Sequence, residues 1–112
     1  MSKDDYFVIA YRLLTYLYAC LKKSKSVNQD ILTAEYFGIG AAYWDYIILN
    51  LYQDGYISGV RTATCFSMLS EPAVIIQPSI NITPKGIQYL SENSMFQKVK
   101  EAAKDIVALI PV

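Results

Sequence analysis

The sequence predicts an α+β fold in which helices come before and after a β-hairpin along the chain. Residues 41–60 begin with apolar side chains at helical spacing and pass through the helix-breaking pair Asp54-Gly55 into a β-forming run. Further along, Ile80 and Ile82 alternate with polar residues, which predicts a strand half buried against helices. A helix that leads directly into a hairpin favours a winged helix-turn-helix, a three-helix core with a β-hairpin wing. Two additional C-terminal helices complete the prediction.

Length and charge limit what the chain can do. With 112 residues it is long enough to bury one hydrophobic core, and we expect a single domain over residues 1–112. Ten basic and ten acidic residues give a formal net charge of zero, so no overall field draws the chain towards nucleic acid or anionic lipid. Ten tyrosines against four phenylalanines predict that some aromatic side chains line a surface or an interface, because the phenol keeps a polar tip.

The types of residue present argue against catalysis. The absence of histidine excludes His-ligated zinc, the Ser-His-Asp triad and the Cys-His pair. Cys20 and Cys65 lack the spacing of a metal site and a neighbouring base, so we expect free thiols in a reducing compartment. We therefore expect a protein that is not an enzyme and has no cofactor. The acidic N-terminus lacks the features of a secretory signal, which favours a cytoplasmic location.

The first predicted helix covers residues 4–23. Acidic residues at its start and lysines at its end complement the helix dipole, and Ser2 or Asp4 is the expected cap. A membrane span is disfavoured, because Arg12 interrupts the apolar run and the run is shorter than the ~20 residues that a bilayer requires. Arg12 is either a buried ion-pair partner or, more commonly for arginine, an edge residue with its head in water. Apolar residues cover more than one side of this helix, namely Phe7, Ile9, Ala10, Leu13, Leu14, Tyr16, Leu17 and Leu21.

A second helix is predicted over residues 29–37, with Asn28 as its N-cap and Val27 as a candidate for a short strand. Gly38 suits the left-handed position that ends a helix, and Gly40 is an acceptable though weaker N-cap for the next one. Helix, three-residue turn and helix form the helix-turn-helix pattern.

The third helix is predicted over residues 41–54, and strands over 56–61 and 79–82. Residues 73–77 are a further candidate for a strand. The segment 61–78 is too apolar for a solvated loop, so this wing either meets a partner or folds back over its own core. The side chains of the third helix that we expect in the core are Trp44, Ile47, Ile48 and Leu51.

Two helices are predicted after the hairpin. Thr83 and Pro84 are suited to the N-cap and first position of a helix over residues 84–92. Ser94 can cap a last helix over residues 95–109, which Pro111 ends. The apolar stripe of this last helix consists of Phe96, Val99, Ala103, Ile106 and Ile110.

Three stretches resemble a known family in their order and spacing. They are LYQDGYISGV at residues 51–60, INITPKG at 80–86 and IQYLSENS at 87–94, followed by a lysine-rich helix. Together they are similar to the YjcQ family of small proteins found in Gram-positive bacteria and their prophages. The resemblance covers nearly the whole chain and implies a winged-helix fold, but it carries over no site residues. The chain departs from the pattern in its apolar segment 61–78 and in Gly40 at a capping position.

The predicted helix-turn-helix is negatively charged, which is unfavourable for binding DNA. Four acids and no Lys or Arg lie between Lys25 and Arg61, a local charge of about minus four. A helix in the major groove needs residues that neutralise phosphates. Side chains on the outer side of the third helix, together with Arg61, are candidate contacts to a protein surface or to bases; the alternative is that they are solvated. The helix residues are Tyr43, Tyr46, Asn50 and Gln53.

Positive charge lies elsewhere, on lysines near the end of the first helix and on the last helix. These lysines are candidate phosphate contacts, and the alternative is that they form a solvated surface. They are Lys22, Lys23, Lys25, Lys98, Lys100 and Lys104.

The first and last helices carry more apolar residues than one core of this size is expected to cover, which predicts a homodimer through these two elements. We expect a non-enzymatic interaction or regulatory module of prophage type, with a protein partner and no contact with membranes. The alternative is a sequence-specific DNA-binding transcriptional regulator.

Overall fold

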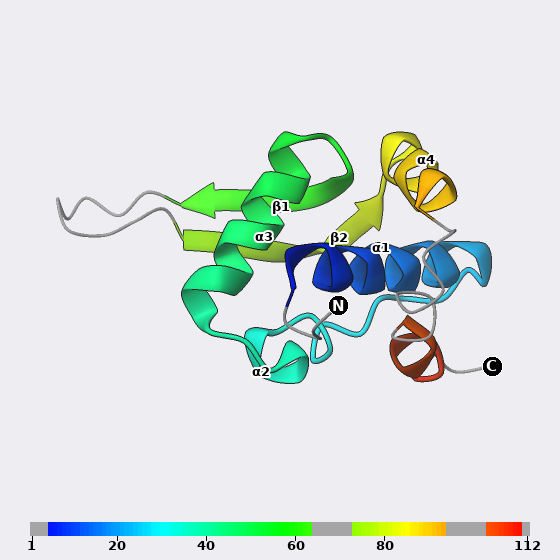
Figure 1. Cartoon of the computed structure of the whole chain (residues 1–112), viewed down its shortest axis with the longest axis horizontal. Coiled ribbons are helices and arrows are strands. Elements are labelled where there is room, and N and C mark those ends of the chain that lie inside the picture. Colours follow the sequence, from blue (N-terminus) through cyan, green and yellow to red (C-terminus); the bar gives the residue numbers. More distant parts are fainter. Residues whose placement is uncertain (1–4, 64–72, 94–102, 111–112) are drawn as a thin grey trace, which may run out of the picture.

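A computed structural model describes residues 5–63, 73–93 and 103–110 of the chain (Figure 1). The described part is a mixed α+β structure with a two-stranded antiparallel hairpin, which confirms the predicted class. Residues 103–107 are also helical. The other elements follow in the order α1 (Tyr6–Lys22), α2 (Ala34–Phe37), α3 (Ala41–Gln53), β1 (Ile57–Ala63), β2 (Ala73–Ile82) and α4 (Pro84–Glu92).

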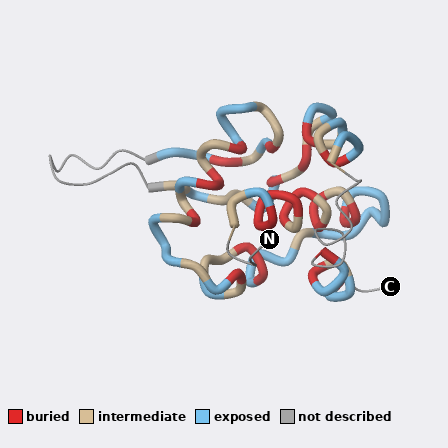
Figure 2. The backbone as a smooth tube through the Cα atoms, viewed as in Figure 1, coloured by how far each residue is buried: buried red, intermediate tan, exposed pale blue. Residues whose placement is uncertain are grey.

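The helix α1 is the centre of the core, and the helix predicted over 4–23 is confirmed over Tyr6–Lys22. It packs against β2, α4 and α3, and Figure 2 shows its length dominated by buried residues. Ten of its 17 residues are buried, so apolar side chains on several sides of the helix are covered by the same chain.

Two residues of α1 that were predicted to face inward are exposed. Phe7 is 57% exposed and Leu21 is 45% exposed. They lie in the first and last turns, whereas the buried set runs from Val8 to Cys20. Helical periodicity was therefore a correct guide only where other elements pack on the helix.

The second helix is shorter than predicted, because α2 occupies Ala34–Phe37 and not 29–37. Asn28 is not its N-cap: Asn28 Oδ1 accepts a hydrogen bond from the Asp30 N–H at 3.0 Å, which makes a local turn. Thr33 is the cap, with an extended backbone and an Oγ1 that accepts from the Tyr36 N–H at 3.1 Å. Val27 does not belong to a strand.

The turn and the third helix agree with the prediction. Gly38 has a φ of +69°, the left-handed conformation that lets the chain leave α2, and Gly40 is the N-cap of α3. Phe37 of α2 stacks on Trp44 of α3, with 5.1 Å between the ring centroids. The buried residues of α3 are the predicted ones, Trp44, Ile47, Ile48 and Leu51.

The hairpin contains a bulge that the sequence pattern did not predict. The strand predicted over 56–61 is β1, and the two candidates over 73–77 and 79–82 are one strand, β2. Ser58 pairs with Asn81 but Val60 pairs with Ile76, so residues 77–80 bulge opposite Gly59. Pro78 lies in this bulge, where a missing N–H breaks no regular ladder. Residues 64–72 of the predicted wing lie outside the described residues.

The helix α4 is confirmed at Pro84–Glu92, with Thr83 as its N-cap. Thr83 Oγ1 accepts from the Gly86 N–H at 3.1 Å, and the same hydroxyl donates to the Gly55 carbonyl. The last helix, predicted over 95–109, is described only from residue 103, where residues 103–107 are helical. Ser94, Phe96, Val99 and Pro111 lie outside the described residues, and the described members of its apolar stripe are buried: Ala103, Ile106 and Ile110.

Candidate functional site

The helix α3 turns one side to the core and leaves the other side to solvent. Tyr46 is 60% exposed and Gln53 is exposed, while Tyr43 and Asn50 are half-buried. Asn50 Nδ2 donates to the Tyr46 carbonyl at 2.7 Å, so part of this amide is engaged within the helix. Of the four predicted contact residues of α3, Tyr46 and Gln53 are open to solvent, whereas Tyr43 packs against the edge of the core.

Three aromatic side chains, Tyr6, Phe7 and Tyr46, form what we call the aromatic cluster. The Tyr6 ring lies 5.5 Å from the Phe7 ring at 84° and 6.3 Å from the Tyr46 ring at 74°. Both arrangements are the edge-to-face geometry that aromatic pairs prefer. The cluster joins the first turn of α1 to the middle of α3, and its two outer members are mostly open to solvent.

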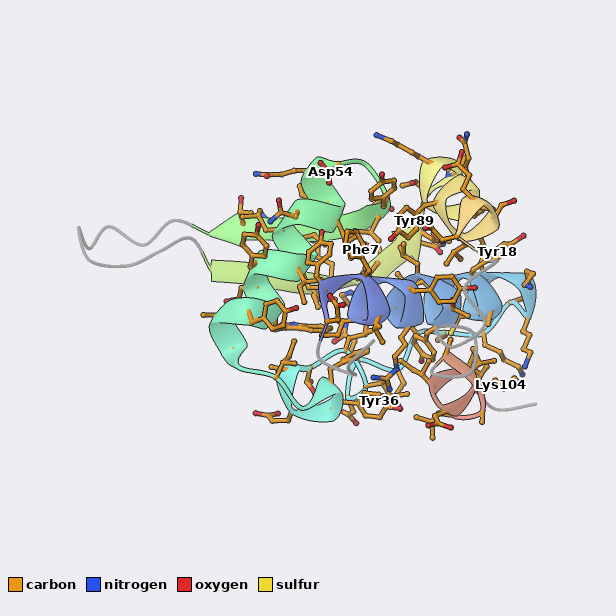
Figure 3. All side chains as sticks on the ribbon, viewed as in Figure 1. Phe7, Tyr18, Tyr36, Asp54, Tyr89 and Lys104 are labelled. Atoms are coloured by element: carbon orange, nitrogen blue, oxygen red, sulfur yellow. The ribbon has the colours of Figure 1, made fainter. Side chains whose placement is uncertain are left out.

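The phenol of Tyr6 lies near a carboxylate and further phenols. Burial raises the pKa of Tyr6, and the Asp54 carboxylate raises it further, as do Tyr46, Tyr89 and Tyr56. The rings of Tyr56 and Tyr89 lie 5.2 Å apart. Figure 3 shows Asp54 at the end of α3, Phe7 between α3 and the start of α1, and Tyr89 beside α4. The Tyr6 phenol is thus under the influence of one exposed acid and of phenols from α3, α4 and the turn before β1.

One lysine borders this region and is already engaged. Lys85 Nζ donates to the Asp54 carbonyl at 2.7 Å and lies 5.2 Å from the centroid of the Tyr56 ring. Among the residues that the structure describes, no cation lies over the three rings of the aromatic cluster.

The stretch of chain that contains α2 and α3 has a negative formal charge. Residues 27–60 contain Asp30, Glu35, Asp45 and Asp54 but no Lys or Arg, and all except the half-buried Asp45 are exposed. Arg61 follows on β1, where it is exposed and paired in register with Ile75. It lies beyond the bulge in the order of the hairpin pairs. The predicted grouping of Arg61 with the α3 residues stays a prediction.

Comparison with protein families identifies the relatives of this chain. The family described as YjcQ protein matches residues 11–108, which is most of the sequence. The chain belongs to the YjcQ family. Comparison with curated proteins and with solved structures gave no match. The YjcQ match includes Tyr46 and Asp54 but begins after Tyr6 and Phe7.

In this YjcQ-family chain, lysines that are far apart in the sequence come together. Lys23 and Lys104 both line a cavity of about 550 Å³ between α1 and the C-terminal helical segment, beside Tyr11 and Thr15. Figure 3 shows Lys104 below the end of α1. Lys22, Lys23, Lys25 and Lys104 are exposed, whereas Lys98 and Lys100 lie outside the described residues.

The lysines and the aromatic cluster are separate surfaces. Phe7 lies in the first turn of α1 and Lys22 in the last, which places them roughly 22 Å apart along the helix axis. Lys22 Nζ lies 4.5 Å from the Tyr18 ring centroid and so stays close to its own helix. The lysines at the end of α1 and the aromatic cluster at its start therefore do not form one site.

Arg12 lies against two aromatic rings, which was not predicted from the sequence. It is half-buried, and its guanidinium carbon lies 4.9 Å from the Phe37 ring centroid and 6.0 Å from that of Tyr36. Its Nε is buried and has no hydrogen-bond partner among the described residues. The two rings stabilise the cation. No local pattern connects residues this far apart in the sequence.

The described residues offer no obvious chemistry. None of them form a group of three His, Cys, Asp or Glu that could hold a metal ion. Burial raises the pKa of the Cys20 thiol, with the Tyr16 hydroxyl and Lys23 acting in the opposite direction, and this disfavours the reactive thiolate. Cys65 lies outside the described residues. No helix in the described parts of the chain has the length and apolar character needed to cross a membrane.

Proposed function

We propose that this YjcQ-family chain is a non-enzymatic interaction or regulatory module of prophage type, which binds a protein partner through the outer side of α3. The aromatic cluster carries the proposal, because exposed Phe7 and Tyr46 lie beside a stretch with four acids and no Lys or Arg. Aromatic side chains are enriched at protein interfaces, whereas carboxylates repel a phosphate backbone. A free, buried Cys20 supports a reducing, cytoplasmic setting.

The order of the elements supports a winged-helix scaffold for this module. The helices α1, α2 and α3 precede the β1–β2 hairpin, and α4 follows it. In such a scaffold α3 takes the position of the recognition helix and the hairpin that of the wing. A shared scaffold does not fix the ligand, so the partner is inferred from the charge and the side chains of α3.

The alternative, a sequence-specific DNA-binding regulator, is supported by a different surface. Exposed Lys23 and Lys104 lie on one cavity, with Lys22 and Lys25 nearby in sequence. Docking on DNA would then use the end of α1 and the last helix in place of α3.

A homodimer through the first and last helices is supported by Leu21 and Leu109, which are 45% and 50% exposed.

One photo-crosslinking experiment tests these proposals. The photoreactive residue p-benzoylphenylalanine replaces Gln53, Lys104 or Leu109, one position at a time, in the full chain expressed in a lysogenic bacterial host. We expect a protein adduct from position 53, and a second copy of this chain as the adduct from position 109. Gln29, which is exposed in the turn before α2, is the control position for chance collisions.

The outcomes separate the candidates. A protein adduct that forms equally at positions 29 and 53 would remove α3 as the binding surface. Nucleic acid at position 104, with no protein at position 53, would replace the proposal by the DNA-binding alternative. An adduct at position 109 that never contains a second copy would reject the homodimer.

A further inference from the structure

We infer that the aromatic cluster and the neighbouring Asp54 dock an arginine-rich or lysine-rich segment of a protein partner. This inference rests on the proposed protein-binding function and adds the chemistry of the partner.

Cations are the natural ligands of the exposed rings. The face of an aromatic ring is negative and attracts an ammonium or guanidinium group that lies within about 6 Å of its centroid. More than half of the Phe7 and Tyr46 side chains is exposed, and Tyr6 lies between them. Three neighbouring rings thus form one aromatic surface at the junction of α1 and α3.

Other aromatic rings of the chain are in contact with cationic side chains of the same chain. Arg12 lies over the ring of Phe37, Lys22 over that of Tyr18, and Lys85 over that of Tyr56. The rings of the aromatic cluster receive no such cation from the described residues. A cationic side chain of a partner would complete at this surface an arrangement that the chain already uses elsewhere.

The Asp54 carboxylate favours positive charge at this surface. Asp54 is exposed, and its carboxylate contributes to the raised pKa of the Tyr6 phenol. Lys85, which borders this region, donates to the Asp54 carbonyl and lies over the Tyr56 ring. An acidic or phosphorylated segment would meet repulsion here, whereas a basic one gains both charge complementarity and ring contacts. Arginine suits the surface better than lysine, because its planar guanidinium stacks on rings and binds carboxylates with two hydrogen bonds.

Fluorescence anisotropy titrations of the full chain test this inference. The probes are a fluorescein-labelled peptide of alternating Arg and Ala, a matched peptide of alternating Glu and Ala, and a labelled oligothymidine strand. We expect binding of the arginine peptide alone. Tyr46→Ala should weaken this binding roughly tenfold, which is the loss of one good cation–ring contact.

Two further variants control for charge and for folding. Tyr52→Ala removes another exposed tyrosine of α3, 41% exposed and outside the cluster, and should leave the affinity within about twofold, as expected for a residue without a contact. Tyr46→Phe keeps the ring and should retain most of the binding. Equal losses from Tyr46→Ala and Tyr52→Ala would overturn the inference.

Other outcomes are equally decisive. If the arginine peptide does not bind while a protein is still crosslinked at position 53, the inference is wrong and the proposed function stands. If neither occurs, both are wrong. Oligothymidine binding that Tyr46→Ala weakens would assign the rings to base stacking instead.

Discussion

Gly59 shows how the absence of one side chain shapes the hairpin. Its φ is +80°, and a Cβ atom at this position would lie 2.5 Å from Ile80 Cα and 2.6 Å from Ile80 N. These are backbone atoms of the bulge in β2, which cannot move aside without breaking the register. Only glycine therefore allows β1 to pass this close to the bulge.

A pair of glycine substitutions separates the backbone conformation from the close contact. Gly38 has a similar φ of +69° but no atom within 4 Å of a Cβ. Gly38→Ala should lower the free energy of unfolding by about 1–2 kcal/mol, the cost of a left-handed residue. Gly59→Ala should lose this amount and about 1–3 kcal/mol more from overpacking. Urea denaturation measures both, and equal losses would show that the bulge tolerates a side chain.

Capping residues were predictable at the residue scale only in part. Thr83 was identified correctly, because Thr followed by Pro before an amphipathic run specifies a helix start. The prediction that Asn28 caps the second helix was wrong, although its side chain has the right chemistry for an N-cap. Its backbone N–H donates to the Tyr16 hydroxyl at 2.9 Å, a contact to buried α1 that no local pattern contains. A tertiary partner decided which of two suitable residues became the cap.

At the element scale, Thr83 connects α4 to the turn between α3 and β1. Its hydroxyl accepts from the Gly86 N–H and donates to the Gly55 carbonyl. Thr83→Ala should lower the free energy of unfolding by about 1–2 kcal/mol for the lost cap and by a further ~1 kcal/mol for the lost bond. Thr83→Ser keeps the hydroxyl and should cost less than about 1 kcal/mol, since both residues are good caps. Denaturant titration that shows equal losses for Ala and Ser would contradict this role.

Helices with a strong apolar periodicity were predicted well, but the contacts between one helix and another were not. The outer residues of α3 followed from helical spacing alone, so Tyr46 could be identified as a candidate contact. Its neighbours Tyr6 and Phe7 were missed, and Phe7 was assigned to the core. Packing of the first turn of α1 beside α3 brings these rings together, and the sequence contains no short-range signal for that packing.

At the scale of the whole molecule, buried tyrosine phenols and a buried thiol predict that the folded state loses stability at high pH. Burial raises the pKa of the phenols of Tyr6, Tyr11, Tyr16 and Tyr89 above the ordinary value of 10.0. It also raises the pKa of the Cys20 thiol above 9.0. Above these ordinary values the unfolded chain has released protons that the folded chain still holds. Stability is therefore fully present below about pH 9 and falls as the pH rises through 9–10 and beyond.

This dependence is measurable as the urea midpoint between about pH 7 and pH 11. We expect a plateau at the lower end and a decline at the upper end. Tyr89→Phe removes one of the contributing phenols and should make the decline shallower. A midpoint that is constant over the whole range would contradict the burial of these groups.

The arrangement along α1 has a consequence for how this molecule meets others. Asp5 and the exposed ring of Phe7 lie at the start of the helix, and Lys22, Lys23 and Lys25 lie at its end, although the net charge is zero. Such a chain has an electric dipole moment, so an approaching charged body exerts a torque on it before any contact forms. The molecule is electrically neutral in total, yet its orientation at first encounter is not random.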